Sequence, residues 1–265
     1  MRAFPPIRVL DALDLPACSD LAESRSWPRE PPKWTLLHDV GQVFGVDAPD
    51  DSGLAASCVL VTFGSVASIS MVLVAPRYER QGLGRAITAQ ALAAAGDRVV
   101  LLHASTYGRP LYESMGFVVD GGCQGHVGSF VDDGGPGASP GSLSDVLALD
   151  LLAQGVDRRP LLERLGTPFV VDGGFAFGVD IGHVTVIGPV VAESEEQARA
   201  LIRGVARSVP GKVRVDPDFR FPGLIEWVRE RGLVPGALAP RLVLHSRLLP
   251  GDPSLRFAPF TRAVG

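Results

Sequence analysis

The chain has 265 residues, of which 46% are hydrophobic and 20% charged, values typical of a globular protein. No apolar run reaches the length of a membrane-spanning helix, and residues 1–6 lack the apolar segment of a signal peptide, so we expect a cytoplasmic protein without a membrane partner. The net charge of −4 argues against a broad nucleic-acid-binding surface. Cys18, Cys58 and Cys123 are isolated and lack metal-ligand spacing, which favours free thiols and no metal.

The first 74 residues predict a strand, two helices and a β-meander. Residues 7–10 are expected to form the strand and residues 15–23 the first helix. A proline-rich segment with Trp27 and Trp34 at its ends leads into a short helix. Turns rich in Gly and Asp then separate three antiparallel strands, predicted at residues 42–47, 55–63 and 67–74.

A glycine-rich loop follows the last of these strands and precedes a helix rich in alanine. Pro76 ends the strand because it has no N–H to donate, and Gly82 and Gly84 lie among several arginines just before the helix. Backbone N–H groups at a helix N-terminus bind phosphate well, so the loop predicts a pyrophosphate site. A Rossmann motif has a similar order but a third glycine and no preceding meander, and the Gly-Lys-Ser/Thr of a P-loop is also absent.

A second motif lies about thirty residues further on. Residues 99–103 predict another buried strand, and after a short loop the chain reads Arg109-Pro110-Leu111-Tyr112, followed by Gly116-Phe117. Together the two motifs resemble those of the GNAT superfamily of N-acyltransferases, in which Gln/Arg-x-x-Gly-x-Gly/Ala binds acyl-CoA and a tyrosine before Gly-Phe protonates the departing thiolate. Tyr112 matches this general acid, whereas Glu79 stands where the family usually has Gln or Arg.

The resemblance implies an acetyl-CoA-dependent N-acetyltransferase that needs no metal. Strand amides near Leu73 and Val74 would fix the pantetheine arm and polarise the thioester carbonyl. The remaining residues implied to bind acetyl-CoA surround the two glycines: Arg77, Arg80, Gln81, Gly82, Gly84 and Arg85.

Residues 132–142 are rich in Gly, Pro and Ser, which predicts a linker between two domains, at residues 1–131 and 143–265. The second half repeats the order meander, helix, strand, helix, but residues 188–194 lack the paired glycines and arginines. This layout resembles bacterial tandem GNAT proteins with an intact first domain and a degenerate second one. The expected fold is therefore α/β (α+β), with two domains that each have a mixed, mainly antiparallel sheet flanked by helices.

The resemblance further implies direct attack by a primary amine on acetyl-CoA in a ternary complex. The amine is expected to be a small molecule bound between the domains, and the protein to be a monomer or homodimer. Residues predicted to contact the acceptor are Trp27, Trp34, His38, Asp172 and Phe175. The general base stays open among His38, His103 and a water relay, because no carboxylate lies on the meander strands of residues 58–74. The alternative function is an acyl-CoA sensor or ligand-binding protein with weak catalysis.

Overall fold

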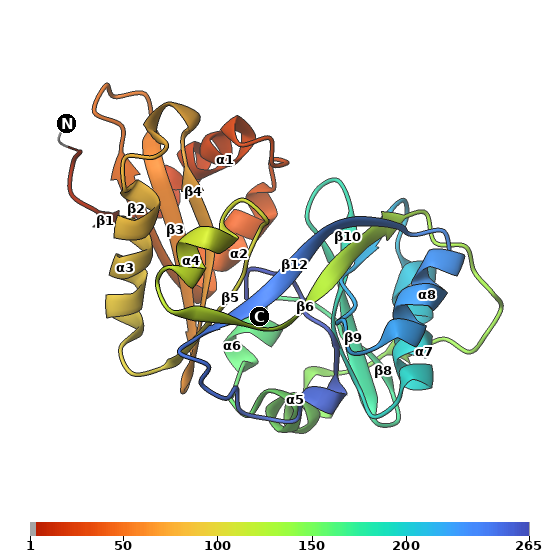
Figure 1. Ribbon diagram of the computed structural model, residues 1–265. Helices are drawn as coiled ribbons and strands as arrows, with labels where there is room; N and C mark the ends of the chain where they lie inside the picture. Colours follow the sequence, from red (N-terminus) through yellow and green to blue (C-terminus); the bar gives the residue numbers. More distant parts are fainter. Residues whose placement is uncertain (1–3, 265) are drawn as a thin grey trace.

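The computed structural model of the protein describes residues 4–264 (Figure 1). The strands of the first half are β1 (Arg8–Val9), β2 (Gly41–Asp47), β3 (Leu54–Phe63), β4 (Val66–Val74), β5 (Val99–His103) and β6 (Phe117–Gly128). Its helices are α1 (Leu15–Ser24), α2 (Pro31–Val40), α3 (Leu83–Ala95) and α4 (Arg109–Glu113). The strands of the second half are β7 (Ser139–Pro140), β8 (Phe169–Val171), β9 (Gly174–Asp180), β10 (Thr185–Ala192), β11 (Val213–Val215), β12 (Val234–Leu244) and β13 (Arg256–Ala258). Its helices are α5 (Leu147–Gln154), α6 (Arg159–Leu162), α7 (Glu195–Ser208) and α8 (Pro222–Glu230).

The strands make one mixed, mainly antiparallel sheet flanked by helices, which confirms the predicted fold class. Its order is β1-β2-β3-β4-β5-β12-β6-β11-β10-β9-β8-β7, with β13 paired to β10. The parallel pairs are β4 with β5 and β10 with β11, one in each half. In the first half, α1, α2 and α3 all pack on the strands β3 and β4 or their neighbour β2. Nearly every residue of β3 is buried, as expected for a strand covered on both faces.

The alanine-rich helix α3 is bounded by two glycines, as the sequence predicts. Gly82 precedes it with a φ of +88° and Gly96 follows it with a φ of +60°, values that glycine adopts without steric cost. In the second half, Ser194 caps α7 by accepting a hydrogen bond from the Gln197 amide, and Glu195 and Glu196 lie in the first turn, where they complement the helix dipole.

Strands β6 and β12 join the two halves of the sheet. The end of β12 lies between β5 and the start of β6, where Leu242 is opposite both Leu102 and Val119. The end of β6 instead reaches β11 of the second half, where Val127 pairs with Arg214. Each half therefore supplies a strand to the sheet of the other. The predicted domain bounds, residues 1–131 and 143–265, stay a prediction, because in the folded protein the two segments share one sheet.

Residues 120–123 read Asp-Gly-Gly-Cys, a sequence that predicts a turn, but β6 continues through them. Gly121 and Gly122 have φ values of +97° and +144°, and they lie beside an irregular register between Pro240 and Leu242 of β12. Glycines inside a strand often mark such bulges. A glycine pair thus bends this strand where the sequence suggested that it ends.

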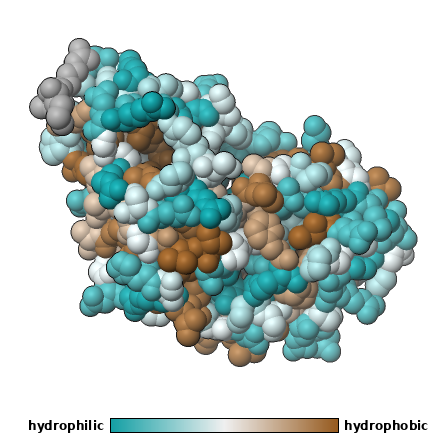
Figure 2. Space-filling view, in the orientation of Figure 1, coloured by the Kyte–Doolittle hydropathy of each residue, from teal (hydrophilic) through white to brown (hydrophobic). Residues whose placement is uncertain are grey.

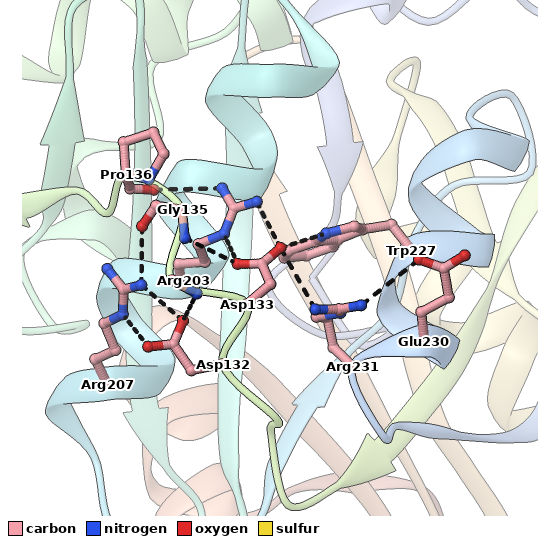
Figure 3. A network of polar contacts seen from close by, with 10 residues as sticks. Asp132, Asp133, Gly135, Pro136, Arg203, Arg207, Trp227, Glu230 and Arg231 are labelled. Carbon is pink, nitrogen blue, oxygen red and sulfur yellow. Dashed lines mark hydrogen bonds and ion pairs between the residues drawn. The ribbon is translucent and has the colours of Figure 1, made fainter.

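The linker at residues 132–142 lies mostly exposed but is held in place by specific contacts (Figure 3). Asp133 accepts hydrogen bonds from the guanidinium of Arg203 and, at 3.2 Å, from the indole of Trp227. Asp132 forms a two-point ion pair with Arg207, at 2.9 and 2.6 Å. Seven residues after Asp132, the linker forms β7, which pairs with β8. The segment is therefore docked on α7 and the sheet along its length.

The surface seen in Figure 2 is mostly hydrophilic, with hydrophobic residues in separate patches over both halves. Cys18, Cys58 and Cys123 are free and buried, which confirms the expected thiols. Among residues 4–264, no helix is both long and apolar enough to cross a membrane.

We predict that Asp133→Ala lowers the free energy of unfolding by about 2–3 kcal/mol, because it leaves the nearly buried Arg203 and the Trp227 N–H without their acceptor. Asp132→Ala is the matched control. It breaks an ion pair whose side chains are 35% and 45% exposed, and such solvent-screened pairs contribute little to stability. Urea unfolding measures both variants, and equal losses would contradict the proposed role of Asp133.

Candidate active site

The loop between β4 and α3 has the geometry of an anion-binding site. Residues 76–78 form a short 3-10 helix, after which Gly82 takes a left-handed conformation and α3 begins. Among residues 4–264, apart from the chain neighbours of Gly82, no atom lies within 4 Å of the position that a Cβ on Gly82 would occupy. A Cβ on Gly84 would lie 3.3 Å from Leu111. The Ala86 amide makes the first hydrogen bond back to the Gly82 carbonyl, so the amides of the preceding turn have no partner within the helix.

Cations surround this loop, and the unexpected acid within it is paired. Glu79 forms an ion pair with Arg25 from the end of α1, so its negative charge is balanced. Sequence reasoning missed Arg25 because it lies 54 residues before Glu79. Arg77 lies 3.4 Å from Asp50, and Arg85 donates to the Ser114 hydroxyl at 2.6 Å. Gln81 and Arg80 are exposed in the same loop, Gln81 donating to the Arg77 carbonyl.

Strands β4 and β5 diverge just before this loop, which leaves a gap between them. Their pairing ends at Ile69 and Leu102, and beyond it Met71 has a φ of +49° within an irregular stretch of the pairing with β3. The Ala75 amide donates to the Ala55 carbonyl of β3, so by strand alternation the Val74 amide faces the open side and the Leu73 amide faces β3. Of the two strand amides predicted to bind the pantetheine arm, Val74 therefore faces the gap and Leu73 does not.

The strand register shows to which face of the sheet each residue beside the gap points. Ser70 follows Ile69 and His103 follows Leu102, the last pair of the two strands, so both side chains are on the same face of the sheet. Val74 points to the opposite face of the sheet from Ser70. Ser70 is opposite Val59 of β3 and Val74 is opposite Ala56, and these two β3 residues face opposite sides because they are an odd number of positions apart. The bulge at Met71 causes this shift.

The face of Val74 is the one covered by α3 and α4. A Cβ on Gly84 would lie 3.7 Å from the Val74 side chain and 3.3 Å from Leu111, the residue that precedes Tyr112 in α4. Figure 1 shows both helices on the near side of this half of the sheet. Tyr112 and His103 therefore belong to opposite faces of the same gap.

The Tyr112 side chain is suited to donate a proton. It is 8% exposed, its ring packs edge-on against Phe117 with centroids 6.0 Å apart, and it lies close to Gly108. Burial raises the pKa of the phenol well above its usual range, so the hydroxyl keeps its proton at neutral pH.

His103 lies on the other face of the gap as a neutral imidazole. Burial, together with the nearby guanidinium groups of Arg241 and Arg262, lowers the pKa of the imidazole to about 4, so it is neutral at pH 7. Its Nδ1 and the Ser70 hydroxyl are both buried without a hydrogen-bond partner among the described residues. Two polar groups without partners on the same face indicate a place where a ligand or water completes the hydrogen bonding. Sequence reasoning did not identify Ser70.

Three of the residues predicted to contact the acceptor do not lie in the gap. Trp34 and Phe175 are each 1% exposed and belong to the hydrophobic core, so their aromatic character serves packing. Asp172 is exposed in the turn between β8 and β9, where its carbonyl accepts a hydrogen bond from Gln197 at the start of α7. Trp27 is 40% exposed after α1, and His38 lies on α2 beside Asp39. For these last two residues a role in acceptor binding stays a prediction.

The equivalent gap in the second half is filled by the chain itself. Strands β10 and β11 pair only at residues 185–186, after which β13 pairs with β10 where the strands diverge. A Cβ on Gly188 would lie 2.3 Å from the Pro259 carbonyl, which shows how closely the following segment packs there. With β13 in the gap, the second half has no open strand edge like that of Val74.

Comparison with known families agrees with this architecture. Two family models, each described as an acetyltransferase (GNAT) domain, match residues 53–128 and 146–258. The chain therefore belongs to the GNAT superfamily, with two GNAT domains in tandem, and is an acyltransferase enzyme.

Similar proteins support the same classification. YitH of Bacillus subtilis (strain 168), an uncharacterized N-acetyltransferase, is 29% identical over 216 residues, which cover 74% of this chain and 76% of YitH. A Pyrococcus horikoshii protein that has been assigned as an acetyltransferase has a TM-score of 0.84 at 18% identity and covers 98% of this chain and 95% of its own. A GCN5-related N-acetyltransferase from Sphaerobacter thermophilus has a TM-score of 0.62 at 18% identity, covering 95% and 99%. At these identities the solved structures show the fold alone.

We predict that Gly82→Asp raises the KM for acetyl-CoA at least about 10-fold, which corresponds to about 1.4 kcal/mol of binding. A carboxylate at the helix N-terminus would repel the pyrophosphate, and the left-handed backbone would be strained. The control is Gly166→Asp, because Gly166 has a φ of +89° and equally open surroundings. Steady-state kinetics compares the two, and an equal effect on KM would show that strain alone is responsible.

A second prediction concerns His103 and pH. Its folded pKa of about 4 lies below the ordinary value of 6.5, so between these values the unfolded chain binds more protons and stability falls as the pH is lowered. His103→Gln should reduce this slope between pH 6.5 and 4, at most by about 1.4 kcal/mol per pH unit. His126, whose pKa burial also lowers, should keep part of the slope. Urea unfolding across this range tests it, and identical slopes would contradict the burial of a neutral His103.

Proposed function

We propose that the protein transfers the acetyl group of acetyl-CoA to a primary amine of a small molecule, by direct attack in a ternary complex. One observation carries this proposal: a buried, protonated tyrosine and a neutral histidine lie on opposite faces of the gap between β4 and β5. Acetyl transfer to an amine needs an acid at the departing thiolate and a base at the amine, and these approach the carbonyl carbon from different sides.

The loop residues fit acetyl-CoA. The open space above Gly82 and the unpaired amides at the start of α3 suit the pyrophosphate, with Arg77, Arg80 and Arg85 close by and Glu79 neutralised by Arg25. The open edge of β4 at Val74 suits the amides of the pantetheine arm. When bound, acetyl-CoA supplies an activated acyl group with a good leaving group.

In this proposal Tyr112 donates its proton to the sulfur, and His103 accepts a proton from the amine. The Val74 amide donates to the thioester carbonyl, and one such donor typically contributes about 3 kcal/mol to lowering the barrier. Because Ser70 lies on the same face as His103 with its hydroxyl buried, it is placed to position the amine or a water that relays its proton.

The second half favours a small acceptor over a protein surface. Its C-terminal segment crosses to the same face as His103, where the Ala263 carbonyl accepts a hydrogen bond from Ser68 of β4 at 3.3 Å. Thr261, Ala263 and Val264 are buried in this arrangement. The face from which an amine would approach is thus walled by the second half. The alternative of an acyl-CoA sensor is favoured by Glu79 in the loop and by the lack of a carboxylate base on the strands. The pairing of Glu79 with Arg25 and the proposed base His103 instead support catalysis.

We predict that Tyr112→Phe lowers kcat about 100-fold or more, the usual contribution of a general acid, and leaves the KM for acetyl-CoA within about twofold of wild type. The ring and its packing on Phe117 are retained in this variant. Tyr107→Phe is the control, because Tyr107 is 67% exposed nearby. Thiol release over a panel of amines measures both variants, and an unchanged kcat for Tyr112→Phe would disprove the acid assignment.

A further inference from the structure

A concave pocket, which we call the arginine cleft, lies on the His103 face where the two halves meet. Its apolar walls include Phe63, Leu101 and Val264, and its polar walls are His103, Arg158, Arg241 and Arg256 with Gln154. Phe63 and Leu101 come from the first half, and Arg256 comes from β13, the strand that fills the gap of the second half. No carboxylate is among the residues that line the cleft.

Arg256 is the least compensated of these cations. Its Nε is buried without a partner, and the one hydrogen bond recorded for its guanidinium among the described residues is to the Pro250 carbonyl, at 3.4 Å. Burial, followed by repulsion from Arg241, Arg220 and Arg158, lowers its pKa to about 10. Holding a charged guanidinium in such surroundings costs free energy unless an anion pairs with it.

The neighbouring carboxylates are engaged by other arginines. Asp150 forms a buried two-point ion pair with Arg158, at 2.6 and 3.2 Å. Asp218 binds Arg220 through both oxygens, at 2.8 Å, and lies 3.8 Å from Arg241. The Nε of Arg241 is also buried without a partner. Arg241 also forms an ion pair with Asp120, at 3.1 Å. The Nε donors of Arg241 and Arg256 stay unused, and among residues 4–264 Arg256 is the arginine of the cleft whose charge has no ion pair.

We propose that the arginine cleft binds an anionic group of the acceptor, a carboxylate or a phosphate, and so directs its amine toward His103. This inference rests on the proposed function, because His103 lines the cleft and is the base assigned there. Guanidinium groups match the geometry of both anions, and the apolar walls would strengthen the pairing by excluding water. The acceptor is then an amine with a negatively charged group, such as an amino acid or an aminoalkyl phosphate.

Anion binding can be tested without the reaction. Inorganic phosphate, compared with chloride at equal ionic strength, should raise the Tm of the wild-type protein by several degrees. Arg256→Met should lose this shift and have an unchanged or higher Tm without phosphate, because it removes a partly buried charge that has no ion pair among residues 4–264. Arg164→Met, which removes an exposed arginine outside the cleft, should keep it. In the Gly82→Asp variant the shift should persist, which separates the cleft from the pyrophosphate loop.

The acceptor class is tested with matched amines: β-alanine against propylamine for the carboxylate, and phosphoethanolamine against ethanolamine for the phosphate. We expect at least one anionic amine to have a kcat/KM at least about 10-fold above its neutral partner. Arg256→Met should abolish that preference by raising the acceptor KM, with the KM for acetyl-CoA unchanged.

The two proposals fail differently. A phosphate shift that depends on Arg256, without transfer to any amine, would overturn the proposed function together with the acceptor role of the cleft. Transfer without preference for anionic amines, and without such a shift, would overturn the arginine cleft and leave the proposed function standing.

Discussion

The architecture depends on the exchange of β6 and β12 between the two halves. The strand beside β5 is β12 of the second half, whereas β6 of the first half pairs with β11. Because hydrogen-bonded strands lie about 4.8 Å apart, this pairing fixes the second half against the first with little freedom. It also brings Arg241 next to His103, since the two are opposite each other in the β5–β12 register. The proposed base, the proposed acceptor face and the arginine cleft all depend on that pairing.

The two halves share a fold but differ where their parallel strands diverge. In both, parallel strands pair briefly and then diverge. In the first half the diverging edge stays open next to a glycine loop, whereas in the second half β13 occupies it and Gly188 lies against Pro259. Acidic residues at the start of α7 replace the arginines near α3. The strand that closes the second gap still contributes to the first half, because it carries Arg256 into the cleft.

Sequence patterns predicted the parts of this protein that depend on local chemistry. The meander, the glycine loop, α3 with its terminal glycines and the buried Tyr112 follow from alternation, φ requirements and motif spacing. Contacts between distant segments were beyond such reasoning. Arg25 and Glu79 meet across 54 residues, and the partner of β5 lies in the last fifth of the chain. The sequence predicts that Trp34 and Phe175 contact the acceptor, because composition alone cannot tell a buried aromatic residue from an exposed one.

The strand exchange has a consequence for synthesis of the chain on the ribosome. The edge of β5 stays unpaired until residues 241–243 have been made, so the half with the active site cannot complete its sheet co-translationally from its own residues. Pairing across about 140 residues closes a long loop and slows folding, and an unpaired edge strand invites association with other chains in the meantime. Production of the first half as an isolated fragment would leave that edge permanently open.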